Sequence, residues 1–184
     1  MIKCYLVAEG PSDVKLLSAL LADIVAPEEV KIVNAGGQSS AISLARTFLV
    51  TSSEAVALLV DADATDPGRV SEFQAELEGS LADVAPRRRF GVFLAIPSLE
   101  VFLFEDQAGL NNEFGDALSP ELIMQSRYEP KAVVKRLLAT QNRPYNPTTQ
   151  ASLVERLDGD RLREAPVIKD LMRFLSGATQ ATTA

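Results

Sequence analysis

The stretch IKCYLVAEGPSDVKLLSALLADIV, residues 2–25, joins two apolar segments of different periodicity. Residues 2–8 form a short apolar run that stops at Glu9-Gly10-Pro11, which is typical of a buried strand. Residues 14–25 carry leucines spaced three and four apart, which is typical of a helix with one apolar face. Ser12 or Asp13 is a suitable N-cap for it. The apolar face is expected to contain Leu16, Leu17, Leu20, Leu21 and Ile24.

The same alternation continues down the chain. Further strands are expected near residues 30–34, 55–61 and 89–96, with helices over 39–50 and 69–84 between them. Strands that alternate with helices at this spacing predict a four-stranded parallel sheet with helices on both faces. An α/β fold is therefore the expected class.

Beyond Pro97 the strand signal fades, and a mainly helical section is expected. Residues 98–104 fit a short helix or an edge strand, and residues 108–122 are expected to be rich in loops. Helices are expected over 130–140, 149–157 and 166–175, and the small polar residues from 177 onward are expected to fray.

Length and composition exclude several classes of protein. The chain has 184 residues, which is the size of one domain with at most a small appendage, and no apolar run reaches the roughly 18 residues of a spanning helix. The first residues do not resemble a leader peptide, so a cytoplasmic location is expected, and Cys4 is expected in the core. Because the chain contains no histidine, serine–histidine triads and histidine-ligated zinc are excluded.

The net charge of −7 is unevenly distributed. Residues 1–123 hold eight Lys and Arg against 19 Asp and Glu, whereas residues 124–184 hold ten against six. The acidic balance argues against a non-specific nucleic-acid coat protein. The basic section is suited to face phosphates, or else forms solvated helix surfaces. The run Arg87-Arg88-Arg89 precedes a strand, so it is expected at the opposite edge of the sheet from the acids described next.

Acidic residues follow three of the four predicted strands. In a parallel α/β sheet the carboxyl ends of the strands meet at one edge, where ligands bind. Five carboxylates are therefore expected to converge there: Glu9, Asp13, Asp61, Asp63 and Glu100.

The negative charge of such a cluster must be compensated by bound cations or by raised pKa values of the carboxyl groups. Two like charges about 4 Å apart repel by about 4 kcal/mol at an effective dielectric constant of 20. Oxygen ligands suit Mg²⁺, Mn²⁺ or Ca²⁺. The strand period of two is expected to point Asp61 and Asp63 the same way, and Gly10 to allow a sharp turn after Glu9. Replacing Asp61 or Asp63 with alanine is expected to relieve repulsion in the ion-free protein without loss of stability.

Two motifs resemble the TOPRIM domain, the metal-binding module of topoisomerases and primases. They are Val7-Ala8-Glu9-Gly10-Pro11-Ser12-Asp13 and Val60-Asp61-Ala62-Asp63, each after an apolar strand. Gly36-Gly37 and Ile96-Pro97-Ser98-Leu99-Glu100 resemble the nuclease branch, the overcoming-lysogenization-defect (OLD) nucleases and their small stand-alone relatives. The resemblance implies a TOPRIM-like metal-binding domain over residues 1–105. Residues 106–184 lie outside the resemblance and are expected to form a mainly helical section packed on that domain.

This resemblance implies a divalent-metal-dependent nuclease that cleaves DNA or RNA, with a role in phage defence beside an ATPase. Two Mg²⁺ or Mn²⁺ ions are expected on the five carboxylates. Glu9 is also a candidate for proton transfer, and Lys131 is the candidate for stabilising transition-state charge. Ser98 is expected to be an N-cap rather than a ligand for water or phosphate. Lys131, Arg136 and Arg143 are expected to contact the nucleic acid.

Several alternatives remain open at this point. A phosphatase that uses Asp-x-Asp expects that motif after the first strand, whereas here it follows the third. A receiver-like domain needs neither Asp63 nor Glu100. A non-catalytic, metal-binding subunit of an ATPase or toxin complex is the main alternative. The chain has no phosphate-binding G-x-x-x-x-G-K-[ST] motif of its own, so a separate ATPase subunit is an expected partner, as is a second copy of the chain.

Overall fold

The computed structural model describes residues 1–180, and its centre is a sheet in which every pair of neighbouring strands is parallel. The spatial order is β2-β1-β3-β4. The predicted four-stranded parallel sheet is confirmed, and each strand begins and ends within two residues of its predicted position. The strands are β1 (Cys4–Ala8), β2 (Val30–Asn34), β3 (Ala55–Asp61) and β4 (Phe90–Ala95).

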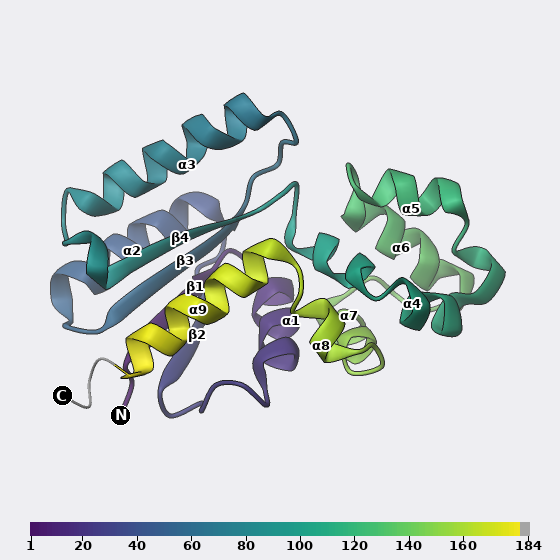
Figure 1. Ribbon diagram of the computed structural model, residues 1–184, viewed down its shortest axis with the longest axis horizontal. Helices are drawn as coiled ribbons and strands as arrows, with labels where there is room; N and C mark the ends of the chain where they lie inside the picture. Colours follow the sequence, from purple (N-terminus) through teal and green to yellow (C-terminus); the bar gives the residue numbers. More distant parts are fainter. Residues whose placement is uncertain (181–184) are drawn as a thin grey trace.

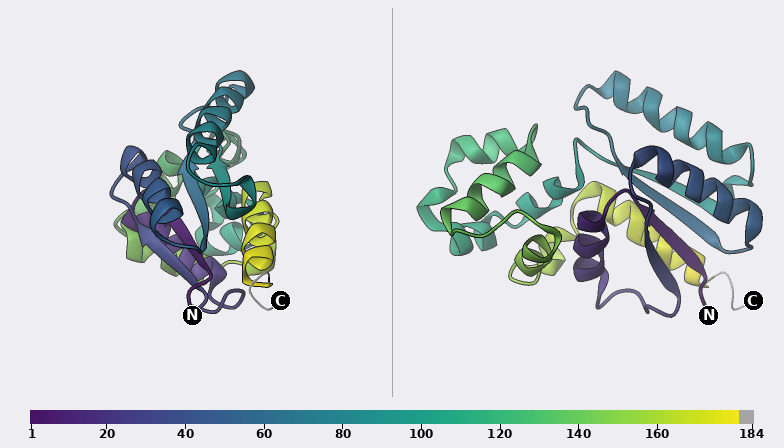
Figure 2. Two further views of the ribbon diagram at one scale, coloured as in Figure 1. Left: turned by 90° about the vertical axis from the view of Figure 1, so that its left-hand side faces the viewer. Right: turned by 180° about the vertical axis from the view of Figure 1, so that it is seen from behind.

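Helices cover both faces of the sheet, as predicted (Figure 2). Successive strand residues point to opposite faces, so β1 places Leu6 against one helical layer and Val7 against the other. One layer contains α1 (Pro11–Leu21) and α9 (Pro166–Gln180). The other contains α2 (Gln38–Thr51) and α3 (Pro67–Ala82). The short 3₁₀ helix η1 (Arg87–Arg89) precedes β4.

Residues 99–165 form a helical lobe beyond the carboxyl ends of the strands, and α9 then returns along the sheet (Figure 1). The apolar cluster under α1 and α9 continues into this lobe through Phe102, Leu137 and Leu153. The predicted domain boundary at residue 105 stays a prediction. The lobe contains η2 (Leu99–Glu105), α4 (Gln107–Phe114), η3 (Gly115–Ala117), α5 (Pro120–Ser126), α6 (Pro130–Thr140), α7 (Pro147–Val154) and α8 (Gly159–Leu162).

The loop-rich prediction for residues 108–122 is wrong, because nearly all of α4, all of η3 and the first turn of α5 lie there. Two side chains cap these short helices: Asp106 accepts from the Gly109 amide, and Ser119 accepts from the Leu122 amide. Helices of seven and eight residues contain too few turns for a clear apolar period. The tertiary core therefore stabilises them more than local sequence does.

The first helix begins earlier and ends earlier than predicted. Its N-cap is Gly10 rather than Ser12 or Asp13, and the Asp13 carboxylate accepts from the Gly10 amide at 2.9 Å. Pro11 can occupy the first turn because an amide there has no helical partner. The chain bends at Glu9-Gly10 as predicted, but Gly10 has an extended backbone, φ −135° and ψ 171°, so the bend does not use the positive φ that glycine allows. Ile24 lies beyond the helix and is 41% exposed.

Further differences lie near the carboxyl terminus. The helix predicted over 149–157 is α7, which begins at Pro147 and ends at Val154, and α8 was not predicted. Residues 177–180, expected to fray, continue α9, whereas residues 181–184 lie outside the described residues. The segment 98–104 is the 3₁₀ helix η2. None of the described helices has the length and apolar character needed to cross a membrane.

Candidate functional site

Acidic residues gather at the carboxyl edge of the sheet, as the topology predicts. Glu9 follows β1, Asp61 ends β3, and Glu100 lies in η2 after β4. The Glu9 carboxylate accepts from the Asp61 amide at 2.7 Å, which joins the ends of two adjacent strands. Asp13 lies close enough for its charge to act on Asp61. The structure therefore brings these four acids into one region.

Gly36 and Gly37 hold the backbone of Glu9 in place. Their amides both donate to the Glu9 carbonyl, at 2.9 and 2.7 Å. Their φ angles of 83° and 131° lie in the region that favours glycine, so this pair allows the turn after β2 to fold over the end of β1. The side-chain amide of Gln38, the next residue, donates to the Asp61 carbonyl at 3.0 Å.

Asp61 is a buried carboxylate with a partner on each of its oxygens. Its side chain is only 7% exposed, Oδ1 accepts from the buried Leu99 amide at 2.9 Å, and Oδ2 lies 2.5 Å from Lys131 Nζ. Burial raises the pKa of Asp61 to about 7, although the Lys131 ammonium acts in the opposite direction. Burial likewise raises the pKa of Asp13 to about 6, with the Gly10 amide opposing and the Glu100 charge adding to the shift.

Lys131 lies in the first turn of α6, 70 residues from Asp61 in the sequence. Burial disfavours its charge, but Asp61, Glu100 and Asp63 together raise the pKa of Lys131 above its usual value. Lys131 is therefore the positive charge of this acidic edge. Its side chain remains half exposed, so the ammonium is accessible to solvent.

Asp63 departs from the predicted geometry. β3 ends at Asp61, and Asp63 has φ 49°, with its amide donating to the Pro97 carbonyl at 2.9 Å. The strand period of two therefore does not extend to Asp63, which is exposed. Asp63 still lies near enough to act on the pKa of Lys131. It is a solvent-facing acid beside the ion pair and does not continue the strand.

Glu100 is 1% exposed, and hydroxyl groups contact both of its carboxylate oxygens. Ser98 Oγ donates to Oε2 at 2.8 Å, and Tyr145 OH donates to Oε1 at 2.7 Å. Ser98 occupies the N-cap position of η2, as expected, but its side chain makes no capping bond and its hydroxyl contacts Glu100 instead. Burial and the Glu100 charge raise the pKa of Tyr145, so the hydroxyl remains a donor at neutral pH.

Two of the three basic residues expected on nucleic acid make no contact with the acids within the described structure. Arg143 pairs with Glu113 at 2.7 Å and is 18% exposed, so its charge is already compensated. Arg156 contacts the same Glu113 oxygen. Arg136 lies exposed on α6, away from the Asp61 contact. Only Lys131 reaches the acidic edge.

Sequence reasoning missed Tyr145 and Gln150. Tyr145 stands in an irregular segment before α7, and nothing in its local pattern separates it from a surface tyrosine. Gln150 lies in α7, is fully buried, and neither of its amide atoms has a hydrogen-bond partner. A polar residue on the apolar face of a predicted helix is the one signal that could have singled out Gln150.

The donor chemistry fits a hard divalent cation. The acids offer only oxygen, and two of them have raised pKa values because burial penalises their charge. Within residues 1–180, however, no three acidic or thiol side chains are close enough together to form a metal-binding group. Lys131 contacts Asp61, and Ser98 and Tyr145 contact Glu100, so these carboxylates have other partners in this structure.

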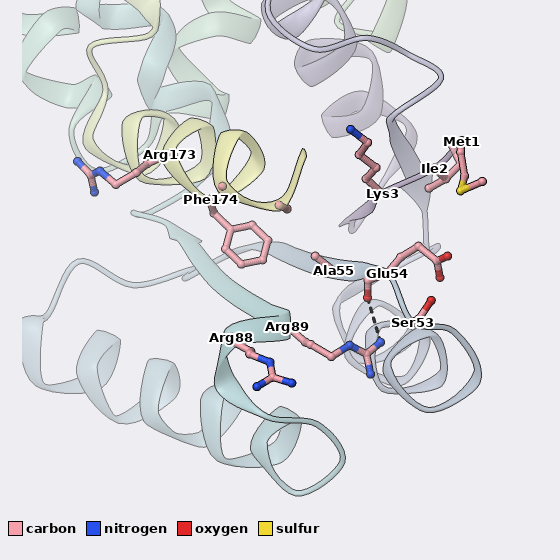
Figure 3. Close-up of a pocket in the computed structure, with 12 residues that line it drawn as sticks. Met1, Ile2, Lys3, Ser53, Glu54, Ala55, Arg88, Arg89, Arg173 and Phe174 are labelled. Atoms are coloured by element: carbon pink, nitrogen blue, oxygen red, sulfur yellow. Dashed lines mark hydrogen bonds between the residues drawn. The ribbon is translucent and has the colours of Figure 1, made fainter. Parts of the chain in front are cut away.

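A pocket of about 450 Å³ lies at the other, amino edge of the sheet (Figure 3). Arg88 and Arg89 line it, as expected from their position before β4. The guanidinium of Arg89 donates to the carbonyls of Leu49, Ser52 and Glu54, so it holds the turn between α2 and β3. Arg87 pairs with Glu78. This run therefore stabilises the fold and lies apart from the acids.

The fold and the site define a parallel α/β protein with an acidic site at the carboxyl edge of its sheet. The chain belongs to the family described as Domain of unknown function (DUF4276), whose model matches residues 8–176. A comparison with curated proteins gave no significant match. Among solved structures, the chain is similar to the C-terminal region of the Burkholderia pseudomallei OLD protein. The TM-score is 0.56 at 19% identity, over 97% of this chain and 99% of that one. This likeness supports the predicted fold.

Proposed function

We propose that this protein is a divalent-metal-dependent nuclease that hydrolyses phosphodiester bonds of DNA or RNA. The observation that carries the proposal is the buried carboxylate of Asp61, which ends β3 and pairs with Lys131, while the Asp61 backbone amide donates to the Glu9 carboxylate. An acid buried at a ligand-binding edge, with a raised pKa and one mobile cation beside it, is suited to bind a metal ion. The fold likeness to a region of an OLD protein is consistent with this class.

We assign the ion-binding role to Glu9, Asp13, Asp61, Asp63 and Glu100. Bound Mg²⁺ or Mn²⁺ ions, two by analogy with other phosphodiesterases, would activate water and stabilise charge on the leaving oxygen. Glu9 and Asp61 come from adjacent strands, so their backbones are held by the sheet. Asp63 is exposed and is the acid most accessible to an arriving ion. Glu9 is also the candidate for moving a proton.

Lys131 has a separate role in this proposal. Its half-exposed ammonium compensates Asp61 in the ion-free protein. A four-carbon side chain can move its ammonium by several ångströms, so Lys131 can leave Asp61 for a phosphate oxygen when an ion neutralises the carboxylate. There it stabilises charge that develops in the transition state. Arg136, exposed on the same helix, is kept as a candidate phosphate contact.

The test is cleavage by the purified chain. Supercoiled plasmid and a structured RNA are incubated with protein in Mn²⁺, in Mg²⁺ and in chelator. Cleavage in metal that Asp61→Asn abolishes and Glu72→Gln retains supports the proposal. Glu72 is an exposed acid on α3 and serves as the matched control. Metal binding without cleavage of either substrate overturns the nuclease proposal and favours a metal-binding subunit that acts with an ATPase or a toxin. A role in phage defence is a further proposal on the same basis.

A further inference from the structure

Tyr145 connects the helical lobe to the acidic edge. Its hydroxyl donates to Glu100 Oε1 at 2.7 Å across 45 residues of sequence. Ser98 donates to the other oxygen of the same carboxylate. Glu100 is almost fully buried, so these two hydroxyls determine how its carboxylate is oriented. A carboxylate oxygen has two lone pairs, so each one can accept a hydroxyl and still bind a cation.

The segment that contains Tyr145 is held in place by the helix that follows it. It lies two residues before α7, and the next residue, Asn146, caps that helix by accepting from the Thr149 amide at 2.9 Å. α7 packs along α1, the helix that begins at the Glu9–Asp13 motif. The fully buried Gln150 of α7 lies beside the Tyr145 hydroxyl, since its amide is one of the groups that act on the pKa of Tyr145. The motif helix thus supports the tyrosine through α7.

We propose that Tyr145 is a positioning residue that holds the Glu100 carboxylate in the orientation needed to bind a divalent ion. The inference rests on the proposed function, because it assigns Glu100 as an ion ligand. Replacing Tyr145 with phenylalanine removes one oxygen atom and leaves Glu100 Oε1 without its hydroxyl donor. The buried carboxylate then turns more freely, and ion affinity falls. Partners of metal ligands typically change metal affinity by about 10- to 100-fold.

The experiment measures Mn²⁺ binding without substrate. Isothermal titration and electron paramagnetic resonance of Mn²⁺ are performed on wild type, Tyr145→Phe and Tyr128→Phe. Tyr128 is 67% exposed and serves as the matched control. Tyr145→Phe is expected to weaken at least one Mn²⁺ ion about 10-fold or more, with Tyr128→Phe equal to wild type. Thermal melting in chelator shows whether the variants remain folded.

A double-mutant cycle distinguishes positioning from a general structural effect. If Tyr145 acts through Glu100, adding Tyr145→Phe to Glu100→Gln causes no further loss of Mn²⁺ affinity. The inference is overturned if Tyr145→Phe lowers Mn²⁺ affinity equally in wild type and in the Glu100→Gln variant. It is also overturned if the Tyr145→Phe variant binds Mn²⁺ like wild type. A wild-type protein that binds no Mn²⁺ overturns the proposed function and this inference with it. Binding by wild type together with an unaffected Tyr145→Phe overturns the inference alone.

Discussion

Asp61 combines two roles at the scale of a single residue. One oxygen satisfies the buried Leu99 amide, and the other contacts the Lys131 ammonium. The sequence alone predicts that alanine is tolerated here in the ion-free protein, because its removal of one charge relieves repulsion among the acids. The structure changes that expectation, since one of the two oxygens is part of the backbone hydrogen-bonding of the fold.

Asp61→Ala is therefore expected to destabilise the ion-free protein. The Leu99 amide loses its acceptor in a buried position, which costs about 1–3 kcal/mol of unfolding free energy. Asp61→Asn keeps an oxygen for that amide and is expected to stay close to wild type, while losing ion binding. Urea unfolding in chelator measures both values. Equal stability of the two variants would contradict the role of Oδ1.

Lys131 is the second residue whose role is testable by itself. Lys131→Ala is expected to lower turnover about 10- to 1,000-fold because it removes a charge that stabilises the transition state. Lys135→Ala, one turn further along α6 and also exposed, is the matched control and is expected to leave turnover unchanged. Single-turnover cleavage at saturating protein measures the difference. Undiminished turnover in Lys131→Ala would mean that the lysine only compensates Asp61.

At the scale of the elements, the turn after β2 positions the end of β1. Gly36 and Gly37 both bond the Glu9 carbonyl, and both need a positive φ. This contact links a glycine motif of the sequence to the backbone of an acid of the site. The site thus depends on a loop that contributes no charged side chain of its own.

Gly37→Ala is expected to lower stability by about 1 kcal/mol or more, because a φ of 131° is strained for alanine although space around the Cβ is open. Gly79→Ala is the control. It lies inside α3, its Cβ also meets open space, and it is expected to raise stability by about 0.5–1 kcal/mol. Thermal unfolding of both variants in chelator tests the pair. A Gly37→Ala variant as stable as wild type would show that the Gly37 backbone is not strained.

At the scale of the whole molecule, the acidic edge links folding to pH. The pKa values of Asp61 and Asp13 rise from 3.8 to about 7 and about 6. At pH values between the unfolded and folded pKa values, Asp61 and Asp13 of the folded protein still bind protons that they have already lost in the unfolded chain. Stability in chelator therefore falls as pH increases from about 4 to about 7.

Calorimetric melting in chelator at pH 5, 6, 7 and 8 is expected to show this decline, and Asp61→Asn is expected to flatten its upper part. Added Mn²⁺ is expected to restore stability at pH 7 to 8, because an ion bound to the folded state alone stabilises it. A melting temperature that increases from pH 5 to pH 7 in chelator would contradict the raised pKa values.

The site combines residues of the helical lobe with residues of the sheet. Lys131 and Tyr145 come from the lobe, whereas Glu9, Asp13 and Asp61 come from the sheet and its first helix. The resemblance seen in the sequence covers residues 1–105 and leaves the lobe without a role. The contacts give it one, since it supplies both the cation and the hydroxyl at the acidic edge.

The parallel α/β fold, and the edge of the sheet at which the acids gather, can be predicted from the amino-acid sequence. Apolar runs and helical periodicity locate strands, and parallel strands must end at one edge, so Glu9, Asp61 and Glu100 follow from local pattern and topology. Even Lys131 was identified from the charge of its section.

The contacts between side chains that are distant in sequence are seen only in the folded structure. The Asp61–Lys131 and Glu100–Tyr145 contacts join residues 70 and 45 positions apart, and the turn of Asp63 away from β3 depends on the Pro97 carbonyl of another segment. The short helices of the lobe are likewise stabilised by burial in the core, because they are too short to show a helical period of apolar residues. Local sequence specifies an element through its neighbours along the chain, whereas contacts between distant side chains arise only when the packed core brings their elements together.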